Sequence, residues 1–415
     1  MKRVAFADVS DGTSERSLMV VMKPDESRDL STGACVEISG LLKPSQGAKQ
    51  DLELEAQKIK TLGAASADYP LQKKYHTPEF LRSIPQFRWK STRNSSVLRY
   101  RSYAHEQLSK YFSENLFTHV QSPVITSSDC EGAGEVFQVR AQDSPDFFGK
   151  PAYLTVSSQL HLEVYAAALS RVWNMTPAFR AEESDTNRHL SEFWMVEAEL
   201  AFTKSLHDVT SVAEAMIRGI LPRGLIATDI IASIRDPERQ EMVQKRWEMI
   251  ENSDHEWPRI TYTEAVETLQ REATHLRKLE WGDDLGSEHE KYLAGNVFRG
   301  PVFITDYPVD LKPFYMKRSV GTEKTAACFD LLVPEFGELI GGSLREDDYD
   351  VLMANMEKLG MDATDMGWYT DLRKYGSFPH GGYGMGFERW VCYACGVDNI
   401  RDAIGFPRWA GSCSC

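Results

Sequence analysis

The sequence predicts an α+β protein in which a small N-terminal β-barrel precedes a larger domain, built on an antiparallel sheet flanked by helices. Three observations lead to this prediction. Short alternating apolar runs separated by turn residues fill 1–65, and a proline-containing stretch without periodicity follows over 66–97. Strand and helix patterns then alternate through 98–415.

The composition predicts a soluble intracellular protein. Of the 415 residues, 26% are charged and 42% hydrophobic, which is ordinary globular composition. The formal net charge of -14 excludes a wholly basic nucleic-acid coat but leaves room for a basic patch. No apolar run reaches the roughly 18–20 residues of a membrane helix, and the N-terminus does not read as a signal peptide. Seven cysteines without framework spacing indicate a reducing compartment.

The N-terminal barrel is expected within 1–65. Its strand-like runs lie at 4–9, 18–22, 33–40, 51–56 and 58–60. Closely spaced strands of this kind favour an OB-fold, a barrel that binds oligonucleotides. The first run resembles the second strand of such a barrel, so the pattern lacks a first strand. Phe6 in this region is a candidate for stacking on a nucleotide base, with core packing as the alternative.

Residues 66–97 are expected to form a basic hinge. The stretch contains Pro70, Pro78 and Pro85, and its cations face only Glu79 as a counter-charge. These cations, which continue into the next segment, are Lys73, Lys74, Arg82, Arg88, Lys90, Arg93, Arg99 and Arg101. A solvated connector and a phosphate-contacting hinge both explain such a concentration of positive charge.

A long helix is expected from Leu98, because Ala104, Leu108, Tyr111 and Phe112 fall on one helical face. An extended stretch follows at 118–125 and contains Pro123. Further along, the lysine- and glutamate-rich stretch 236–250 predicts an inserted helical segment between two strand-rich blocks.

Two alternating strands, 176–183 and 193–200, flank a polar loop. Side chains alternate faces in a strand, so Phe193, Glu197 and Glu199 share one face while apolar residues occupy the other. A sheet with an apolar back and a charged, aromatic front is typical of a ligand-binding floor. A solvent-exposed outer face is the alternative.

Two further segments carry residues suited to a nucleotide. Gly382, Gly384 and Gly386 alternate, and a strand glycine usually marks close approach by a ligand or another backbone. Followed by Arg389, this strip favours a nucleotide lying flat with its phosphates near the guanidinium. In the segment 336–346, Glu338 has the chemistry of a Mg²⁺ ligand.

These segments together resemble a known family. Phe179-Arg180-x-Glu182 with its strand pair, and Gly-x-Gly-x-Gly-x-Glu388-Arg389 with its helix, are similar to motifs 2 and 3 of class II aminoacyl-tRNA synthetases. The helix that leads to Pro123 resembles motif 1, the dimer-interface element. The segments 126–137, 147–150, 154–160 and 188–195 narrow the resemblance to asparaginyl-tRNA synthetases, closest to fungal mitochondrial members.

The resemblance implies a homodimeric asparagine–tRNA ligase of the mitochondrial matrix, with the cytoplasm as the alternative location. It implies an OB-fold anticodon-binding domain at 1–65, a hinge at 66–97 and a class II catalytic domain at 98–415. Such an enzyme uses ATP with Mg²⁺ to make asparaginyl-adenylate and pyrophosphate, and then transfers asparagine to the 3'-terminal ribose of tRNA(Asn). Because a carboxylate attacks the α-phosphate without a general base, catalysis is positioning and charge neutralisation.

The resemblance also implies residue roles. The implied ATP-binding residues are Arg180, Glu182, Arg188, His189, Phe193, Glu338, Gly386 and Arg389, of which Arg180, Glu338 and Arg389 are also the implied catalytic residues. Adenine would lie between Phe193 and Arg389. The implied Mg²⁺ ligands are Glu338, Ser343 and Asp330; Glu131 and Gln159 would bind the substrate ammonium group; Phe6, Lys73 and Lys74 would contact tRNA.

Asparagine and aspartate have nearly the same shape, so discrimination has to be electrostatic. Arg345 would take the side-chain carbonyl oxygen, and Glu197 is the candidate acceptor for the amide NH₂. Aspartyl enzymes usually carry Asp in place of Glu197 and Lys in place of Leu162, so both residues favour asparagine.

Three rival functions remain open: an aspartyl-tRNA synthetase, a catalytically silent tRNA-binding paralogue, and an asparagine synthetase of the synthetase-like type. The silent paralogue is disfavoured because the implied site residues Arg180, Glu182, Glu338 and Arg389 are intact. The asparagine synthetase is disfavoured by the predicted N-terminal barrel.

Overall fold

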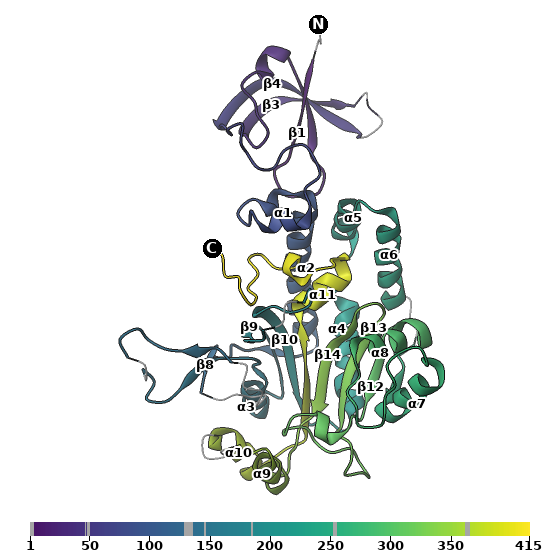
Figure 1. The fold of residues 1–415 in the computed structure, drawn as a ribbon. Helices are drawn as coiled ribbons and strands as arrows, with labels where there is room; N and C mark the ends of the chain where they lie inside the picture. The colour runs from purple at the N-terminus through teal and green to yellow at the C-terminus, as the bar shows by residue number, and fades with distance from the viewer. Residues whose placement is uncertain are drawn as a thin grey trace. The chain divides into compact units, whose positions relative to one another are not determined.

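The computed structural model describes residues 4–415 except 46, 48–49, 128–135, 145–146, 184–185, 252–254 and 362–365. The chain divides into two compact units (Figure 1). The first comprises Met1–Tyr100 and Arg223–Gln240 with the terminal Cys415, and the second comprises Arg101–Pro222 and Glu241–Ser414.

The first unit contains a small twisted sheet. Its strands are β1 (Ala5–Val9), β2 (Leu18–Met22), β3 (Cys35–Pro44) and β4 (Leu52–Gly63), in the order β1-β2-β4-β3. β2 and β4 are parallel, and the other pairs are antiparallel. The predicted runs 51–56 and 58–60 form one continuous strand. Within the described residues this sheet has four strands, whereas a complete OB-fold has five.

The helices of the first unit are short. α1 (Pro78–Arg82) begins after Thr77, whose hydroxyl accepts a hydrogen bond from the Phe80 N–H and so satisfies one of the free donors of the first turn. α5 (Gly224–Ser233) contributes Asp229, which forms an ion pair with Arg99.

The second unit is built on an eight-stranded sheet in the order β11-β12-β13-β14-β15-β10-β9-β5. The bounds of these strands are β5 (Thr118–His119), β9 (Arg171–Phe179), β10 (Glu192–Ala201), β11 (Arg259–Thr261), β12 (Val302–Thr305), β13 (Cys328–Val333), β14 (Gly337–Leu344) and β15 (His380–Gly386). The six central strands pair antiparallel, and the two edge strands pair parallel with their neighbours. β6 (Ile125–Thr126), β7 (Gln138–Val139) and β8 (Ala152–Leu154) form a separate three-stranded sheet.

Helices accompany this sheet (Figure 1). They are α3 (Gln159–Leu169), α4 (Leu206–Gly219), α7 (Tyr262–Glu272), α8 (Ser287–Tyr292), α9 (Tyr349–Lys358), α10 (Gly367–Lys374) and α11 (Phe387–Cys395). α2 (Thr92–Glu114) and α6 (Pro237–Glu251) each contain a boundary between the two units. None of the helices in the described part of the chain is long and apolar enough to cross a membrane.

Two helices, α2 and α6, lie in the segments for which the sequence predicts helices. α2 begins six residues before Leu98, and Ala104, Leu108 and Phe112 are fully buried, as the predicted face requires. α6 occupies the predicted inserted segment. The α+β class is confirmed, because antiparallel strands and helices are combined throughout the second unit.

The core of the second unit lies against its sheet. One apolar cluster joins Tyr262, Val266 and Leu269 of α7 to Val302 and Ile304 of β12. These residues recur at helical spacing on α7 and at alternate positions on β12, which explains how the two elements bury one common face. In the strand order of this sheet, β14, β15 and β10 are adjacent and lie at the centre.

Candidate functional site

Three adjacent central strands position the predicted site residues. β10 pairs with β15 so that Glu197 lies opposite Gly384 and Glu199 opposite Gly382. β14 pairs with the other edge of β15 and places Gly341 opposite Gly384. Since side chains alternate along each strand, the odd-numbered residues of β10 project over the same face as the glycines.

One cavity of about 200 Å³ gathers all the predicted nucleotide residues. Its lining includes Arg180, Glu182, Arg188, His189, Phe193, Glu338, Gly386 and Arg389. Arg180 and Glu182 follow β9, Phe193 is the second residue of β10, and Arg389 lies in the first turn of α11. Motifs far apart in sequence therefore meet at one place.

The charges in this nucleotide cavity are loosely paired and partly exposed. Arg389 Nη1 lies 3.3 Å from Glu338 Oε2, and the two side chains are 35% and 38% exposed. Glu182 lies 3.9 Å from Arg180 and 3.5 Å from His189. The Arg180 guanidinium stands 5.7 Å from the centre of the Phe193 ring.

Arg188 is anchored at the edge of the cavity. Its guanidinium donates hydrogen bonds to the Ser287 hydroxyl and to the Phe336 carbonyl, both at 2.8 Å. It also lies over the Phe336 ring at 5.2 Å. Burial, together with repulsion from Arg389, lowers the pKa of Arg188.

Carboxylates converge beside β14. A Cβ atom built on Gly341 would stand 3.4 Å from both Asp330 Oδ1 and Glu338 Oε1, so these two carboxylates approach one point. Glu290 of α8 lies next to them and accepts a hydrogen bond from the Glu338 N–H at 3.1 Å. Burial and repulsion from Glu338 raise the pKa of Glu290 to about 7. Lys312 forms an ion pair with Asp330 at 3.0 Å.

Ser343, one of the predicted metal ligands, is placed elsewhere. It is fully buried, and its hydroxyl accepts a hydrogen bond from Arg345 Nη1 at 2.8 Å. Because this bond ties Ser343 to Arg345 and not to the converging carboxylates, we drop it from the candidate metal ligands and keep Asp330 and Glu338.

The residues predicted to bind the amino-acid substrate lie further along the same sheet and at the start of α3. Both carboxylate oxygens of the buried Glu197 face the start of α3, where they accept hydrogen bonds from the Ser157 and Ser158 hydroxyls and from the Ser158 N–H. A carboxylate at this position is stabilised by the helix N-terminus. Gln159 begins α3 and Arg345 follows β14. Glu131 lies outside the described residues.

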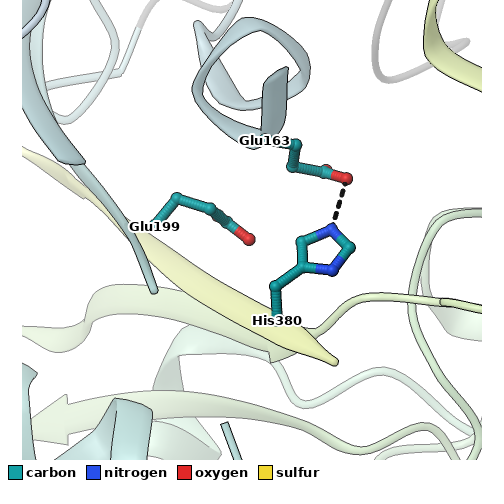
Figure 2. A group of neighbouring side chains, drawn as sticks. All are labelled: Glu163, Glu199 and His380. Carbon is teal, nitrogen blue, oxygen red and sulfur yellow. Dashed lines mark hydrogen bonds and ion pairs between the residues drawn. The ribbon is translucent and has the colours of Figure 1, made fainter. Parts of the chain in front are cut away.

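A buried ion-pair network surrounds Arg345. Glu199 accepts hydrogen bonds from Arg345 Nε at 3.1 Å and Nη2 at 2.9 Å. Glu163 accepts from Arg373 Nη2 at 2.5 Å and lies 3.0 Å from His380 Nε2. Figure 2 shows Glu163, Glu199 and His380 pointing toward one another from three different elements. These residues are between 0% and 5% exposed.

Glu163, Glu199 and His380 have the spacing of metal ligands, since their ligand atoms lie within 4.8 Å of one another. However, two guanidinium groups already neutralise the two carboxylates. Burial would raise the pKa of Glu163, but Arg373, His380 and Arg345 hold the pKa of this carboxyl well below its usual range. The group therefore forms an ion-pair network and not a metal site.

The glycine strip of β15 serves two purposes. A Cβ on Gly382 would meet Glu199 Oε2 at 2.0 Å, so this glycine makes room for the buried glutamate. Gly384 and Gly386 line the cavity that the predicted nucleotide residues share. The prediction that the whole strip faces a nucleotide is therefore wrong at Gly382.

The predicted tRNA-binding residues belong to the first unit. Phe6 is 63% exposed on β1, which excludes core packing. Lys74 is exposed, and the Lys73 side chain is 91% exposed at 3.7 Å from Asp8.

Several arginines of the predicted basic hinge and of the segment that follows it have structural roles. Arg82 pairs with Glu79, Arg99 with Asp229, and Arg101 with Glu388 at 2.7 Å. Arg88 is buried and stacks on Trp89 at 4.3 Å. The expectation that these cations have Glu79 as their sole counter-charge is therefore wrong, and the exposed positive charge is carried by Lys73, Lys74 and Lys90.

Sequence reasoning missed Glu163, Arg373 and Glu290. Glu163 had one visible signal, a glutamate within the otherwise apolar stretch of α3 beside Leu162. Arg373 had none, because 210 residues separate it from Glu163. Glu290 lies on a charged six-residue helix that looks like solvent-exposed surface in sequence.

Comparisons with known proteins agree with this arrangement. The family described as tRNA synthetases class II (D, K and N) matches residues 81–410. The mitochondrial asparagine–tRNA ligase of Saccharomyces cerevisiae is 45% identical over 98% of this chain and 89% of its own length. The asparagine–tRNA ligase of Clostridium novyi is 43% identical over 99% and 92%.

Among solved structures, asparaginyl-tRNA synthetase from Pyrococcus horikoshii complexed with asparaginyl-adenylate superposes with a TM-score of 0.85. It is 31% identical over 99% of this chain and 92% of that chain. The fold and the near full-length identity agree on one family. The chain therefore belongs to the asparagine–tRNA ligases, within the class II tRNA synthetases.

Proposed function

We propose that this chain activates L-asparagine with ATP, forming asparaginyl-adenylate and pyrophosphate, and then transfers asparagine to the 3'-terminal ribose of tRNA(Asn). The observation that carries the proposal is the single cavity in which Arg180, Glu182, Phe193, Glu338 and Arg389 come together. Near full-length identity to asparagine–tRNA ligases supports the choice of amino acid.

In the proposed reaction the cavity works by positioning and charge neutralisation. Arg180 holds the α-phosphate beside the attacking carboxylate of asparagine, and Arg389 and Phe193 hold the two faces of adenine. Glu182 accepts a hydrogen bond from the adenine amino group. Arg188 and His189 contact the outer phosphates, which leave as pyrophosphate. The loose ion pairs of the cavity suit this role, because Arg180 can leave Glu182 for the α-phosphate and Arg389 can leave Glu338 for the adenine ring.

Mg²⁺ fits the carboxylates beside β14. Asp330 and Glu338 approach one point near Gly341, and Mg²⁺ is usually held by one or two carboxylates together with substrate phosphates. When bound, the ion would neutralise charge on the polyphosphate. Lys312, which pairs with Asp330, holds that carboxylate in place.

The amino-acid end of the floor would bind asparagine. Gln159, with Glu131, binds the ammonium group, Arg345 donates to the side-chain carbonyl, and Glu197 accepts from the amide NH₂. Leu162 is fully buried and offers no charge to an aspartate carboxylate. The burial of Glu197 and Arg345 strengthens their electrostatic selectivity, because charge interactions are weakly screened there.

The first unit would read tRNA. The exposed Phe6 stacks on an anticodon base, and Lys73 and Lys74 contact phosphates. In this proposal residues 1–65 form the anticodon-binding domain, 66–97 the hinge and 98–415 the catalytic domain.

A homodimer through the motif 1 region near Pro123 is part of the proposal. Pro123 is exposed, and Leu116, Leu169 and Phe202 are 82%, 45% and 67% exposed. Their segments adjoin, since the Ala201 N–H donates to the Ser170 carbonyl and Arg171 donates to the Asn115 carbonyl. Exposed apolar side chains on adjoining segments beside the edge strand β5 suit a subunit interface. The mitochondrial matrix is the proposed location, on the similarity to the yeast mitochondrial enzyme.

Pyrophosphate exchange tests the proposed function. Purified protein is expected to exchange labelled pyrophosphate into ATP when asparagine is present, and to charge tRNA(Asn) transcripts. Exchange that depends on aspartate would instead identify an aspartyl enzyme. No exchange with either amino acid would identify a catalytically silent paralogue, and ammonia-dependent formation of asparagine would identify a synthetase of the other type.

A further inference from the structure

Glu163 connects two predicted amino-acid-binding residues. Its Oε1 accepts hydrogen bonds from Gln159 Nε2 and the Tyr369 hydroxyl, both at 3.1 Å, and lies 4.0 Å from Arg345 Nε. Because the Gln159 amide NH₂ is turned toward Glu163, its carbonyl oxygen is the atom left to receive an ammonium group. Glu163 therefore orients Gln159 and faces Arg345 with one carboxylate oxygen.

The other oxygen of Glu163 fixes the opposite side of the network. Oε2 accepts from Arg373 Nη2 and faces His380 Nε2, while the Arg373 Nε–H donates to the Glu346 carbonyl. His380 Nδ1 faces the Phe378 carbonyl at 2.8 Å. These contacts come from α3, α10 and β15, so Glu163 holds three elements at one buried point.

The network balances its charges in pairs. Glu199 forms an ion pair with Arg345. Glu163 forms an ion pair with Arg373 and also lies near Arg345. Arg345 uses three of the five N–H donors of an arginine on Glu199 and Ser343, so two remain for a ligand while its positive charge is compensated. In a buried site such a guanidinium binds a neutral carbonyl well, whereas an additional carboxylate would bring unmatched negative charge into weakly screened surroundings.

We propose that Glu163 is a positioning residue that sets the charge balance around Arg345 and thereby makes the pocket select asparagine over aspartate. The inference rests on the proposed function, which supplies the two competing amino acids. It adds a determinant beyond Glu197 and Leu162, because Glu163 acts through Arg345 and Gln159 and touches neither substrate side chain.

The test changes the charge balance in both directions in the full-length protein. Glu163→Gln keeps the shape and removes one negative charge, so aspartate should bind more tightly relative to asparagine by about tenfold. Arg373→Gln removes one positive charge and should shift the ratio the opposite way. The readout is the inhibition constant of aspartate against asparagine-dependent pyrophosphate exchange, divided by the KM for asparagine.

Glu214→Gln is the matched control. Glu214 is also a buried glutamate bound by two arginines, Arg218 at 2.8 Å and Arg259 at 3.4 Å, but it lies on α4 outside this network. Its variant should keep the wild-type ratio. The KM for ATP should stay unchanged in Glu163→Gln, which a general loss of folded structure would not allow.

The two proposals can fail separately. If wild-type protein shows no asparagine-dependent exchange, the proposed function is wrong. If wild-type protein exchanges but folded Glu163→Gln keeps the wild-type ratio, or Glu214→Gln shifts the ratio equally, the inference alone is wrong. Should Glu163→Gln not fold, an unchanged ratio in Arg373→Gln overturns the inference in its place.

Discussion

The nucleotide cavity and the buried network lie on the same three strands, β10, β14 and β15, but they hold charge differently. In the cavity, Arg389 and Glu338 are 3.3 Å apart and more than a third exposed. In the network, Arg345 and Glu199 are 2.9 Å apart and nearly inaccessible. A loose, solvated ion pair can give up its partner for a contact with ATP. A tight, buried ion pair keeps its partner, so it offers a substrate hydrogen bonds without net charge.

The difference matches the two proposed substrates. ATP brings several negative charges, so its site keeps cations that can change partner. Asparagine has a neutral side chain, and at its end of the floor the buried arginines Arg345 and Arg373 are each paired with a buried glutamate. The comparison predicts that substitutions in the cavity will affect catalysis without much loss of stability, and that substitutions in the network will affect stability and amino-acid choice.

The largest expected effect is on catalysis in the cavity. Arg180→Ala should lower kcat/KM for asparagine-dependent pyrophosphate exchange about a thousandfold, because a preorganised cation at the α-phosphate is lost. Exchange kinetics measure this directly. Arg271→Ala, which removes an exposed arginine paired with Glu272, is the control and should leave exchange unchanged. If Arg180→Ala lowers kcat/KM by about tenfold or less, Arg180 does not stabilise the transition state of this step.

The second-largest expected effect is a difference between the two regions in the free energy of unfolding. Arg345→Met leaves the buried Glu199 unpaired and should lower the free energy of unfolding by about 3 kcal/mol. Arg389→Met breaks a partly exposed pair and should cost less than about 1 kcal/mol. Urea denaturation of both variants provides the measurement. Equal losses in the two variants would show that the distinction between the regions is wrong.

The pH dependence of stability sharpens the same contrast. The pKa of Glu163 is lower in the folded chain than its ordinary value of 4.5. Ionised Glu163 therefore contributes stability that is fully present above pH 4.5 and is lost as the pH falls through its folded-state pKa. The difference in Tm between wild type and Glu163→Gln should be largest near neutral pH and should shrink in acid. A difference that stays constant well below pH 4.5 would contradict the assignment.

The sequence predicts the cavity better than the network for a physical reason. Arg180, Glu182 and Phe193 belong to one strand pair, and Gly386 and Arg389 to one strand–helix junction, so short motifs carry their geometry. The network depends on pairs such as Glu163–Arg373 and Glu199–Arg345, whose members lie 210 and 146 residues apart. A buried charged pair looks in sequence like two solvated residues, and the contact exists only after folding.

Arg99 and Arg101, which follow the predicted hinge, show the same limit of reasoning from local sequence. Arg99 and Arg101 look unpaired in sequence because their partners, Asp229 and Glu388, lie 130 and 287 residues away. A local count of charge therefore overstates the basic surface, and it misassigns residues whose role is to fix helices. Strand and helix positions were predictable because their apolar periodicity is local.

The smallest expected effect concerns tRNA. Phe6→Ala should raise the KM for tRNA(Asn) about tenfold, because one base–aromatic stacking contact is lost. Asparagine-dependent pyrophosphate exchange should not change, since that step needs no tRNA. Phe6→Trp keeps an aromatic surface and should restore the KM, whereas Phe6→Leu keeps only apolar area and should not. If Phe6→Leu behaves like wild type, the exposed ring on β1 serves some purpose other than stacking, and tRNA recognition by this unit has to rest on Lys73 and Lys74.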